Sequence, residues 1–203
     1  MRKSGLYKFV IHDHKVCQTG IQFKPVYKDS AMRFCLLIMC LFAFSVSAEV
    51  SDPIKKAMEA PAKVGEARFS RYFWDIYDAT LYAPDGKWQN KPPFALRLVY
   101  LRDIEGKQIA KHSIKEMKKQ GLDDEQKSQR WQTQMQDIFP DISNNDVLTG
   151  IATKNNSTQF FYNGEAIGTI EDTDFTQRFF DIWLGENTSE PEFREQLLKK
   201  AKS

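Results

Sequence analysis

Few side chains suited to acid–base, nucleophilic or metal chemistry occur after residue 48. His112 is the only histidine in that part of the chain, and it lies among lysines in a segment that we expect to be exposed. A Ser-His-Asp triad or a histidine-rich metal site cannot be assembled around one such residue. Cys17, Cys35 and Cys40 all precede residue 49, so thiol chemistry and disulfide bonds are excluded from the remainder.

Sequence motifs for common cofactors are also missing. The chain contains no GxGxxG, GxxxxGKS/T, HExxH or CxxC pattern, the motifs of dinucleotide, phosphate, zinc and redox sites. The acidic run Asp123-Asp124-Glu125 lacks the spacing of a calcium loop and is typical of the first turn of a helix. The sequence therefore predicts neither a cofactor nor a metal.

Residues 32–48 have the features of a secretory signal peptide. Met32-Arg33 gives a positive start, residues 34–44 an apolar core, and Val46-Ser47-Ala48 a cleavage site of small residues. The apolar run is shorter than the ~20 residues of a transmembrane helix, which favours cleavage over an uncleaved anchor. We expect translation to begin at Met32, with residues 1–31 an upstream extension, and 49–203 to be a single periplasmic or secreted domain with no integral membrane span.

The charge balance changes when this leader is set aside. Seven of the 29 Lys and Arg but only two of the 27 Asp and Glu lie before residue 49, so the net charge falls from +2 to about −3. No basic cluster with interleaved aromatics remains, which excludes a typical nucleic-acid interface. The composition leaves a small molecule or another protein as the partner.

The elements that must position any site follow from the hydrophobic periodicity. Runs of aromatic, β-branched and apolar residues predict six strands: two within residues 67–82 that meet near Trp74-Asp75, one over 94–101, one over 147–153, and two over 159–162 and 166–170 that flank an Asn163-Gly164 type I′ turn. Helical periodicity predicts four helices: from Gly106 to Gly121, over 124–139, from Asp172 or Thr173 to Gly185, and after a capping box at Ser189 and Glu192. Strands and helices that alternate in blocks favour an α+β fold, an antiparallel β-sheet with helices packed on one face.

Three segments of this pattern together resemble the chalcone isomerase-like family. They are Gly65-Glu66-Ala67-Arg68, then Tyr77-Asp78-Ala79-Thr80-Leu81-Tyr82, and the late helix with the sequence FTQRFFDIWLG over residues 175–185. Ile138-Phe139-Pro140-Asp141 adds a resemblance to the exported bacterial branch of that family. The resemblance covers residues 64–198 and implies an open-faced sandwich, in which a curved antiparallel sheet and its helices enclose a cleft for an apolar ligand.

The resemblance also implies a kind of ligand. The plant enzymes of the family close a flavanone ring by holding a phenolate, and non-enzymatic members bind fatty acids, each through an arginine on the first strand. A guanidinium suits both anions, because it stays charged and presents a fork of donors. The family therefore implies a small apolar acid or a phenolic compound as the ligand here.

Site residues carry over unevenly from the family. Arg68 matches the strand arginine, Tyr77 a cleft hydroxyl, and Thr176 the serine or threonine of the late helix. The expected catalytic tyrosine and asparagine are replaced by Ile109 and Glu116, so donors that would stabilise the developing charge are lost. The resemblance thus implies ligand binding by Arg68, Tyr77 and Thr176, without chalcone cyclisation.

Several alternatives remain open at this point. Arg71 alternates with Phe69 and Phe73, so Arg71 could face the cleft while Arg68 pairs with a local acid. An isomerase or intramolecular lyase acting on another substrate would use Tyr77, Thr176 and a Glu116 whose pKa is raised by an apolar cleft. A structural or protein-interaction role would need no small ligand, and a filled cleft would favour it.

Overall fold

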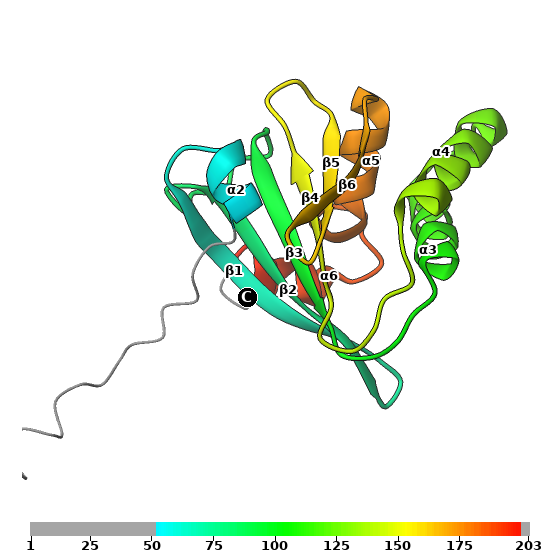
Figure 1. Cartoon of the computed structure of the whole chain (residues 1–203), viewed down its shortest axis with the longest axis horizontal. Coiled ribbons are helices and arrows are strands. Elements are labelled where there is room, and N and C mark those ends of the chain that lie inside the picture. The colour runs from blue at the N-terminus through cyan, green and yellow to red at the C-terminus, as the bar shows by residue number, and fades with distance from the viewer. Residues whose placement is uncertain (1–51, 200–203) are drawn as a thin grey trace, which may run out of the picture. The chain divides into compact units, whose positions relative to one another are not determined.

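A computed structural model describes residues 52–199 of this protein. The predictions for residues 1–31 and 32–48 lie outside this range. Six strands form one antiparallel sheet in sequence order (Figure 1): β1 Pro61–Arg71, β2 Trp74–Pro84, β3 Phe94–Tyr100, β4 Val147–Ala152, β5 Thr158–Tyr162 and β6 Glu165–Ile170. The helices are α2 Asp52–Ala57, α3 Gly106–Lys119, α4 Glu125–Ile138, α5 Thr173–Leu184 and α6 Pro191–Leu197. In this part of the chain, none of the helices combines the length and the apolar character that crossing a bilayer requires.

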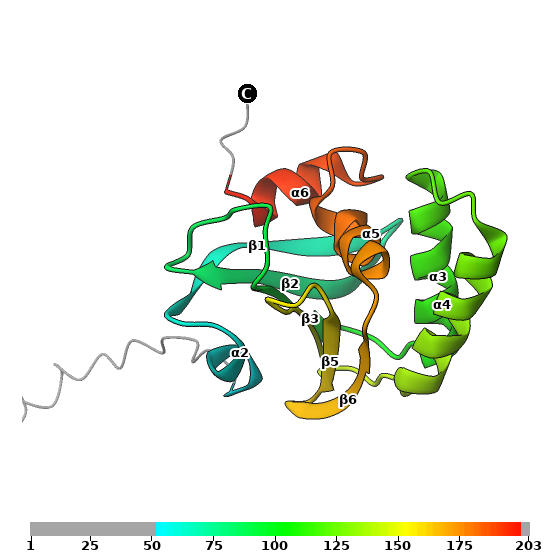
Figure 2. The same ribbon diagram turned by 90° about the horizontal axis from the view of Figure 1, so that it is seen from above.

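The predicted α+β fold is confirmed, with one helix that the sequence did not predict. Four helices, α3 to α6, belong to the layer that covers one face of the sheet, and α6 packs on β1 and β2. Helix α2 covers the opposite face (Figure 2), where Ile54 and Met58 pack against Tyr82, Ala95 and Ile151. The lead-in looked polar, but two apolar residues four positions apart are enough to bury one side of a short helix.

The β1–β2 hairpin is longer than the sequence predicted. Pro61 pairs with Pro84 and Arg71 with Trp74, so β1 begins six residues before the expected start at Ala67 and the turn lies at Tyr72-Phe73, just before the expected place. Tyr72 adopts a positive φ of 56° in this turn. The Asn163-Gly164 turn is confirmed, because both residues have the positive φ that a type I′ turn requires.

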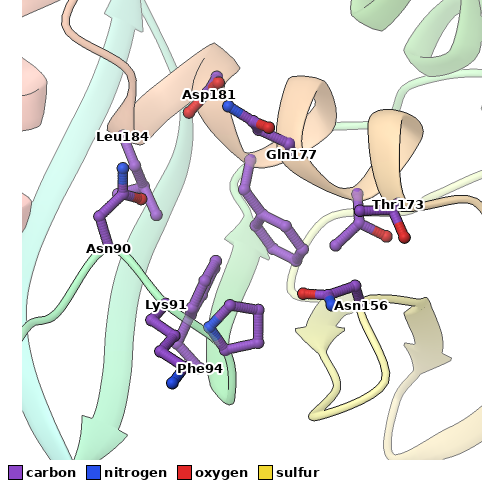
Figure 3. Close-up of a pocket in the computed structure, with 11 residues that line it drawn as sticks. Asn90, Lys91, Phe94, Asn156, Thr173, Gln177, Asp181 and Leu184 are labelled. Atoms are coloured by element: carbon purple, nitrogen blue, oxygen red, sulfur yellow. The ribbon is translucent and has the colours of Figure 1, made fainter.

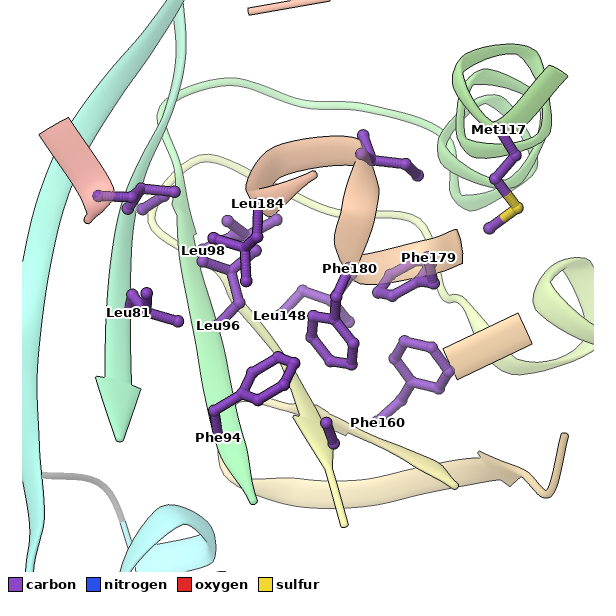
Figure 4. Packing of buried hydrophobic residues seen from close by; sticks show 14 of the residues in the cluster. Leu81, Phe94, Leu96, Leu98, Met117, Leu148, Phe160, Phe179, Phe180 and Leu184 are labelled. Atoms are coloured by element: carbon purple, nitrogen blue, oxygen red, sulfur yellow. The ribbon is translucent and has the colours of Figure 1, made fainter. Parts of the chain in front are cut away.

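An aromatic core joins α5 to the middle of the sheet (Figure 4). The ring of Phe180 lies 4.8 Å from that of Phe94, and Phe179 lies 5.2 Å from Phe160, each pair edge to face. Gly150 of β4 leaves room for these rings, because a Cβ there would come within 3.4 Å of Phe180. Each buried phenylalanine stabilises the folded state by about 1.5–3 kcal/mol because its ring leaves water. Phe179 and Phe180 therefore hold α5 firmly against the sheet.

Helices α3 and α4 form an antiparallel pair, and α3 also contacts α5. The segments before α3 and after α4 are joined where Ile104 and Ile142 exchange backbone hydrogen bonds and where the Gly106 amide donates to Asp141 at 3.0 Å. A Cβ on Gly106 would collide with the carbonyl of Phe139. This close approach gives a physical reason for the glycine that begins α3 and for the aspartate that follows α4.

The predicted capping box of α6 is wrong. Glu190 is the N-cap residue and makes no capping hydrogen bond with its side chain. The hydroxyl of Ser189 donates instead to Glu116 of α3 at 2.7 Å. A hydrogen bond to a charged carboxylate is stronger than one between neutral groups. Ser189 therefore links α3 to the segment before α6 instead of capping α6.

Candidate ligand-binding site

A pocket of about 390 Å³ lies where β1 and β3 end and β2 begins, between these strands, α3 and the last turn of α5. Its apolar wall comes mainly from Phe69, Tyr77, Tyr100, Ile109, Ile182 and Trp183. Its polar groups are mainly Arg71, His112, Lys115, Glu116, Ser189 and Glu190. A concave apolar site with a few converging polar groups is the usual form of a small-molecule site.

Three aromatic residues of neighbouring strands build the wall on the sheet side. Tyr77 pairs directly with Phe69 on β1 and with Tyr100 on β3, and directly paired residues point to the same face of a sheet. The rings of Phe69 and Tyr77 are stacked at 5.0 Å, and those of Tyr77 and Tyr100 meet at an angle at 5.6 Å. The strand register therefore builds this wall and offers an aromatic, apolar surface to a ligand.

Tyr77 contributes a hydroxyl to the pocket as well as a ring. The indole nitrogen of Trp183 donates a hydrogen bond to the Tyr77 hydroxyl at 2.9 Å. Burial is the main cause that raises the pKa of Tyr77 well above its ordinary value, while the hydrogen bond from Trp183 acts in the opposite direction. The phenol therefore keeps its proton, and because its oxygen accepts from Trp183, that proton can be donated to a ligand.

Glu116 is a buried carboxylate at the α3 side of the pocket. One oxygen accepts from Lys119 at 2.8 Å and the other from Ser189 at 2.7 Å. Burial opposes its ionisation, but these hydrogen bonds and the nearby His112 outweigh burial, so the pKa of Glu116 is lowered. The isomerase alternative required a raised pKa for Glu116, and this part of it is wrong, because an apolar cleft raises a carboxylate pKa only where partners do not satisfy the charge.

His112 lies at the pocket edge, with its Nε2 3.7 Å from Glu116. Burial lowers its pKa, and the charges of Arg71, Lys119 and Lys115 lower it further, although Glu116 acts in the opposite direction. The imidazole is therefore mostly neutral near pH 7. It adds a hydrogen-bonding group to the pocket and no full positive charge.

Arg68 lies outside this pocket. Its guanidinium makes a two-pronged hydrogen bond with Asp78, at 2.7 and 2.9 Å, and a third with Asp75 at 3.1 Å. These groups are exposed on the face of the β1–β2 hairpin opposite to Phe69 and Tyr77, as the alternation of strand side chains requires. Arg68 thus takes the alternative arrangement left open above, pairing with local acids at the surface.

Arg71 lines the pocket in its place. The residue lies two positions after Phe69 and is half exposed at the end of β1. Its nearest carboxylate is Glu190 at 3.9 Å, at the edge of ion-pair distance, and its guanidinium lies 5.8 Å from the ring of Tyr72. Arg71 therefore has more donors and more uncompensated charge for an anionic ligand than Arg68, which already binds two carboxylates.

Thr176 lies about two turns of α5 from Trp183 and faces a different cavity of about 280 Å³. Figure 3 shows this second cavity, with Thr173, Gln177 and Asp181 of α5 on one side and Asn90 and Lys91 on the other. The Thr176 hydroxyl is buried and accepts from Thr158 at 2.9 Å. The structure thus places Tyr77 and Arg71 in one pocket and leaves Arg68 and Thr176 outside it.

Trp183, Ser189 and Lys115 were not predicted as ligand-binding residues, and Ser189 was predicted to cap a helix. All three line the pocket. A signal for Trp183 was present, since an indole N–H that is mostly buried requires an acceptor. Among the residues that the structure describes, no group of three or more His, Cys, Asp or Glu is placed to hold a metal ion.

The model of the chalcone isomerase-like family matches residues 65–199. The chain belongs to the chalcone isomerase-like family. An uncharacterized protein of Haemophilus influenzae is 35% identical to this family member over 141 residues, which cover 69% of each chain. The crystal structure of an Arabidopsis thaliana fatty-acid binding protein is similar in fold, with a TM-score of 0.54 and 15% identity, over 70% of this chain and 88% of that one. Ile109 and Glu116, which replace the tyrosine and asparagine expected in the family's enzymes, both line the pocket.

Proposed function

We propose that this chalcone isomerase-like protein is exported and binds a small apolar anionic ligand, fatty-acid-like or phenolic, in the pocket between β1–β3, α3 and α5. The observation that carries the proposal is the position of Arg71 and the Tyr77 hydroxyl beside one aromatic wall. The acid of the ligand accepts hydrogen bonds from these two groups, and its apolar part packs on Phe69, Tyr100 and Ile109. The fatty-acid binding protein with a similar fold is consistent with such a ligand.

Binding is favoured over isomerase chemistry by the state of Glu116. A general base needs a free oxygen and a pKa near the working pH, whereas Lys119 and Ser189 occupy both oxygens of Glu116 and its pKa is lowered. Export rests on the sequence of residues 32–48. It is tested by fractionating cells that produce the full chain and determining the first residue of the purified protein, for which we expect Glu49.

The ligand is tested by titration with cis-parinaric acid, a fluorescent polyene acid, and displacement by dodecanoic acid or dodecanol. We expect Arg71→Ala to weaken acid binding by about tenfold or more, as for loss of a charge-assisted contact, and to leave the affinity for dodecanol unchanged. Arg68→Ala is the matched control, because it removes an arginine of the same strand from the opposite face. Unchanged acid binding by Arg71→Ala, or an equal loss in Arg68→Ala, contradicts the proposal.

A further inference from the structure

The tip of the β1–β2 hairpin gathers exposed hydrophobic side chains. Tyr72, Phe73 and Trp74 are 87%, 98% and 61% exposed, and they are the exposed large hydrophobic residues within residues 52–199. Figure 1 shows the hairpin extending beyond the ends of the neighbouring strands. Burial in the core does not explain three consecutive aromatic residues at such a turn, because none of them is buried there.

We propose that this tip docks on the surface of a bilayer that contains anionic phospholipid. The order of side chains fits the chemistry of that surface: the purely apolar ring of Phe73 is the most exposed, and it lies between a tyrosine and a tryptophan, the two residues enriched where hydrocarbon meets headgroups. A convex tip can enter a fluid headgroup layer without a preformed groove.

The charges beside the tip fit lipid phosphates. The guanidinium of Arg102 lies over the ring of Trp74 at 4.7 Å, and that of Arg71 lies 5.8 Å from the ring of Tyr72, so a cation flanks each side of Phe73. The nearby carboxylates Asp75 and Asp78 are both hydrogen-bonded to Arg68. Arg68 offsets one of these two negative charges, and the guanidinium groups of Arg71 and Arg102, which lie by the rings of Tyr72 and Trp74, are the groups that can meet lipid phosphates.

A protein partner fits this tip less well. A stable protein interface buries about 800 Å² on each side and involves roughly 20 or more residues, whereas the apolar part of the tip consists of three side chains. On the exposed face of the hairpin, the side chains next to the tip are charged or polar, such as Arg68, Ser70 and Asp75. A further consequence of docking on lipid is that the pocket, which Arg71 lines, lies next to the bilayer surface.

The test uses the protein as purified after export and vesicles of equal parts phosphatidylcholine and phosphatidylglycerol, with brominated phosphatidylcholine as a quencher and no added ligand. The readout is the quenching of tryptophan fluorescence. The quenching lost in the Trp74→Phe variant is the part due to Trp74, one of four tryptophans. We expect strong quenching of Trp74. The matched control is Trp88→Phe, which removes a tryptophan after the far end of β2 and leaves the quenching unchanged.

Two further variants separate the apolar and the charged contributions. We expect Phe73→Ser to lower vesicle binding by at least about tenfold, as for removal of one inserted aromatic ring. Arg102→Gln lowers it by a few-fold, on the order of one lipid-facing charge, and only on vesicles with phosphatidylglycerol. An unquenched Trp74, quenching that disappears with Trp88 instead, or unchanged binding of Phe73→Ser overturns the proposal. Loss of acid binding in Arg71→Ala is measured without vesicles, so failure of the ligand proposal and failure of this one are distinguished.

Discussion

Trp183 donates a 2.9 Å hydrogen bond to the hydroxyl of Tyr77, and this bond joins the last turn of α5 to β2 inside the pocket. The two residues are 106 positions apart in sequence. Because the Tyr77 oxygen serves as the acceptor, its proton is directed elsewhere. The arrangement makes a sheet-face tyrosine a donor in the pocket that Arg71 also lines.

Tyr77→Phe tests this donor. The variant leaves the indole N–H of Trp183 without its acceptor, so we expect the free energy of unfolding to fall by about 1 kcal/mol. Acid binding weakens about fivefold, for loss of one neutral hydrogen bond. Trp183→Phe is the control, since it removes the same internal bond but keeps the tyrosine proton. Urea unfolding and cis-parinaric acid titration of both variants measure the two effects. Equal loss of affinity in both variants would show that Tyr77 acts only through packing.

Ile109→Trp tests whether the ligand occupies this pocket. Ile109 is half-buried at its wall, and the larger indole can extend into the open volume rather than into the core. We expect acid binding to weaken by more than about tenfold, because the added ring takes the place of the ligand, while the free energy of unfolding changes by less than about 1 kcal/mol. Ile109→Val, which enlarges the pocket, is the control and keeps binding. Full binding by Ile109→Trp would move the site elsewhere, with the cavity beside Thr176 as the next candidate.

Glu116 makes the stability of the protein depend on pH. Its pKa in the folded state is lowered from the ordinary 4.5, so the folded state favours the ionised form. The resulting stabilisation is fully present above about pH 4.5 and is lost as the pH falls through the lowered folded pKa. Glu116→Gln is expected to lower the free energy of unfolding by about 1–2 kcal/mol at neutral pH.

The same difference should shrink below the folded pKa of Glu116, where the carboxyl is protonated in both states. Urea unfolding of the protein and Glu116→Gln over a series of pH values measures it. Glu165→Gln, an exposed position on β6, controls for general charge effects. A difference that stays constant from neutral to acidic pH would be evidence against the Lys119 and Ser189 contacts as the cause.

Gly65→Ala tests why the first family segment begins with glycine. A Cβ at Gly65 would collide with the backbone carbonyls of Gln196 and Leu197 at the end of α6, and backbone atoms cannot move aside cheaply. We expect a loss of more than about 2 kcal/mol in the free energy of unfolding, or a shifted α6. Gly121→Ala is the matched control, because Gly121 has open space but a positive φ of 91°, which costs about 1 kcal/mol. If Gly65→Ala loses no more than Gly121→Ala, close packing of α6 does not explain the glycine.

Local sequence patterns were sufficient for most of the fold. The apolar run over residues 94–101 predicted a strand, and β3 covers Phe94–Tyr100 as the third of six. The Asn163-Gly164 turn was predicted because only residues that tolerate positive φ fit there. Helix α2 was missed, because two apolar residues in a polar segment give too weak a period to recognise before the sheet face that they cover is known.

The sequence by itself determined the family, the order of strands and helices, the lack of thiol or histidine-rich chemistry after residue 48, and the presence of arginines on an aromatic strand. Only the tertiary structure decided that Arg71 rather than Arg68 lines the pocket. A period of two fixes that neighbouring residues face opposite sides, but not which side is covered by helices. Likewise, only the fold brings Ser189 to Glu116 and Trp183 to Tyr77. The first pair is separated by 73 positions in sequence and the second by 106, and hydrogen bonds over such separations leave no local pattern.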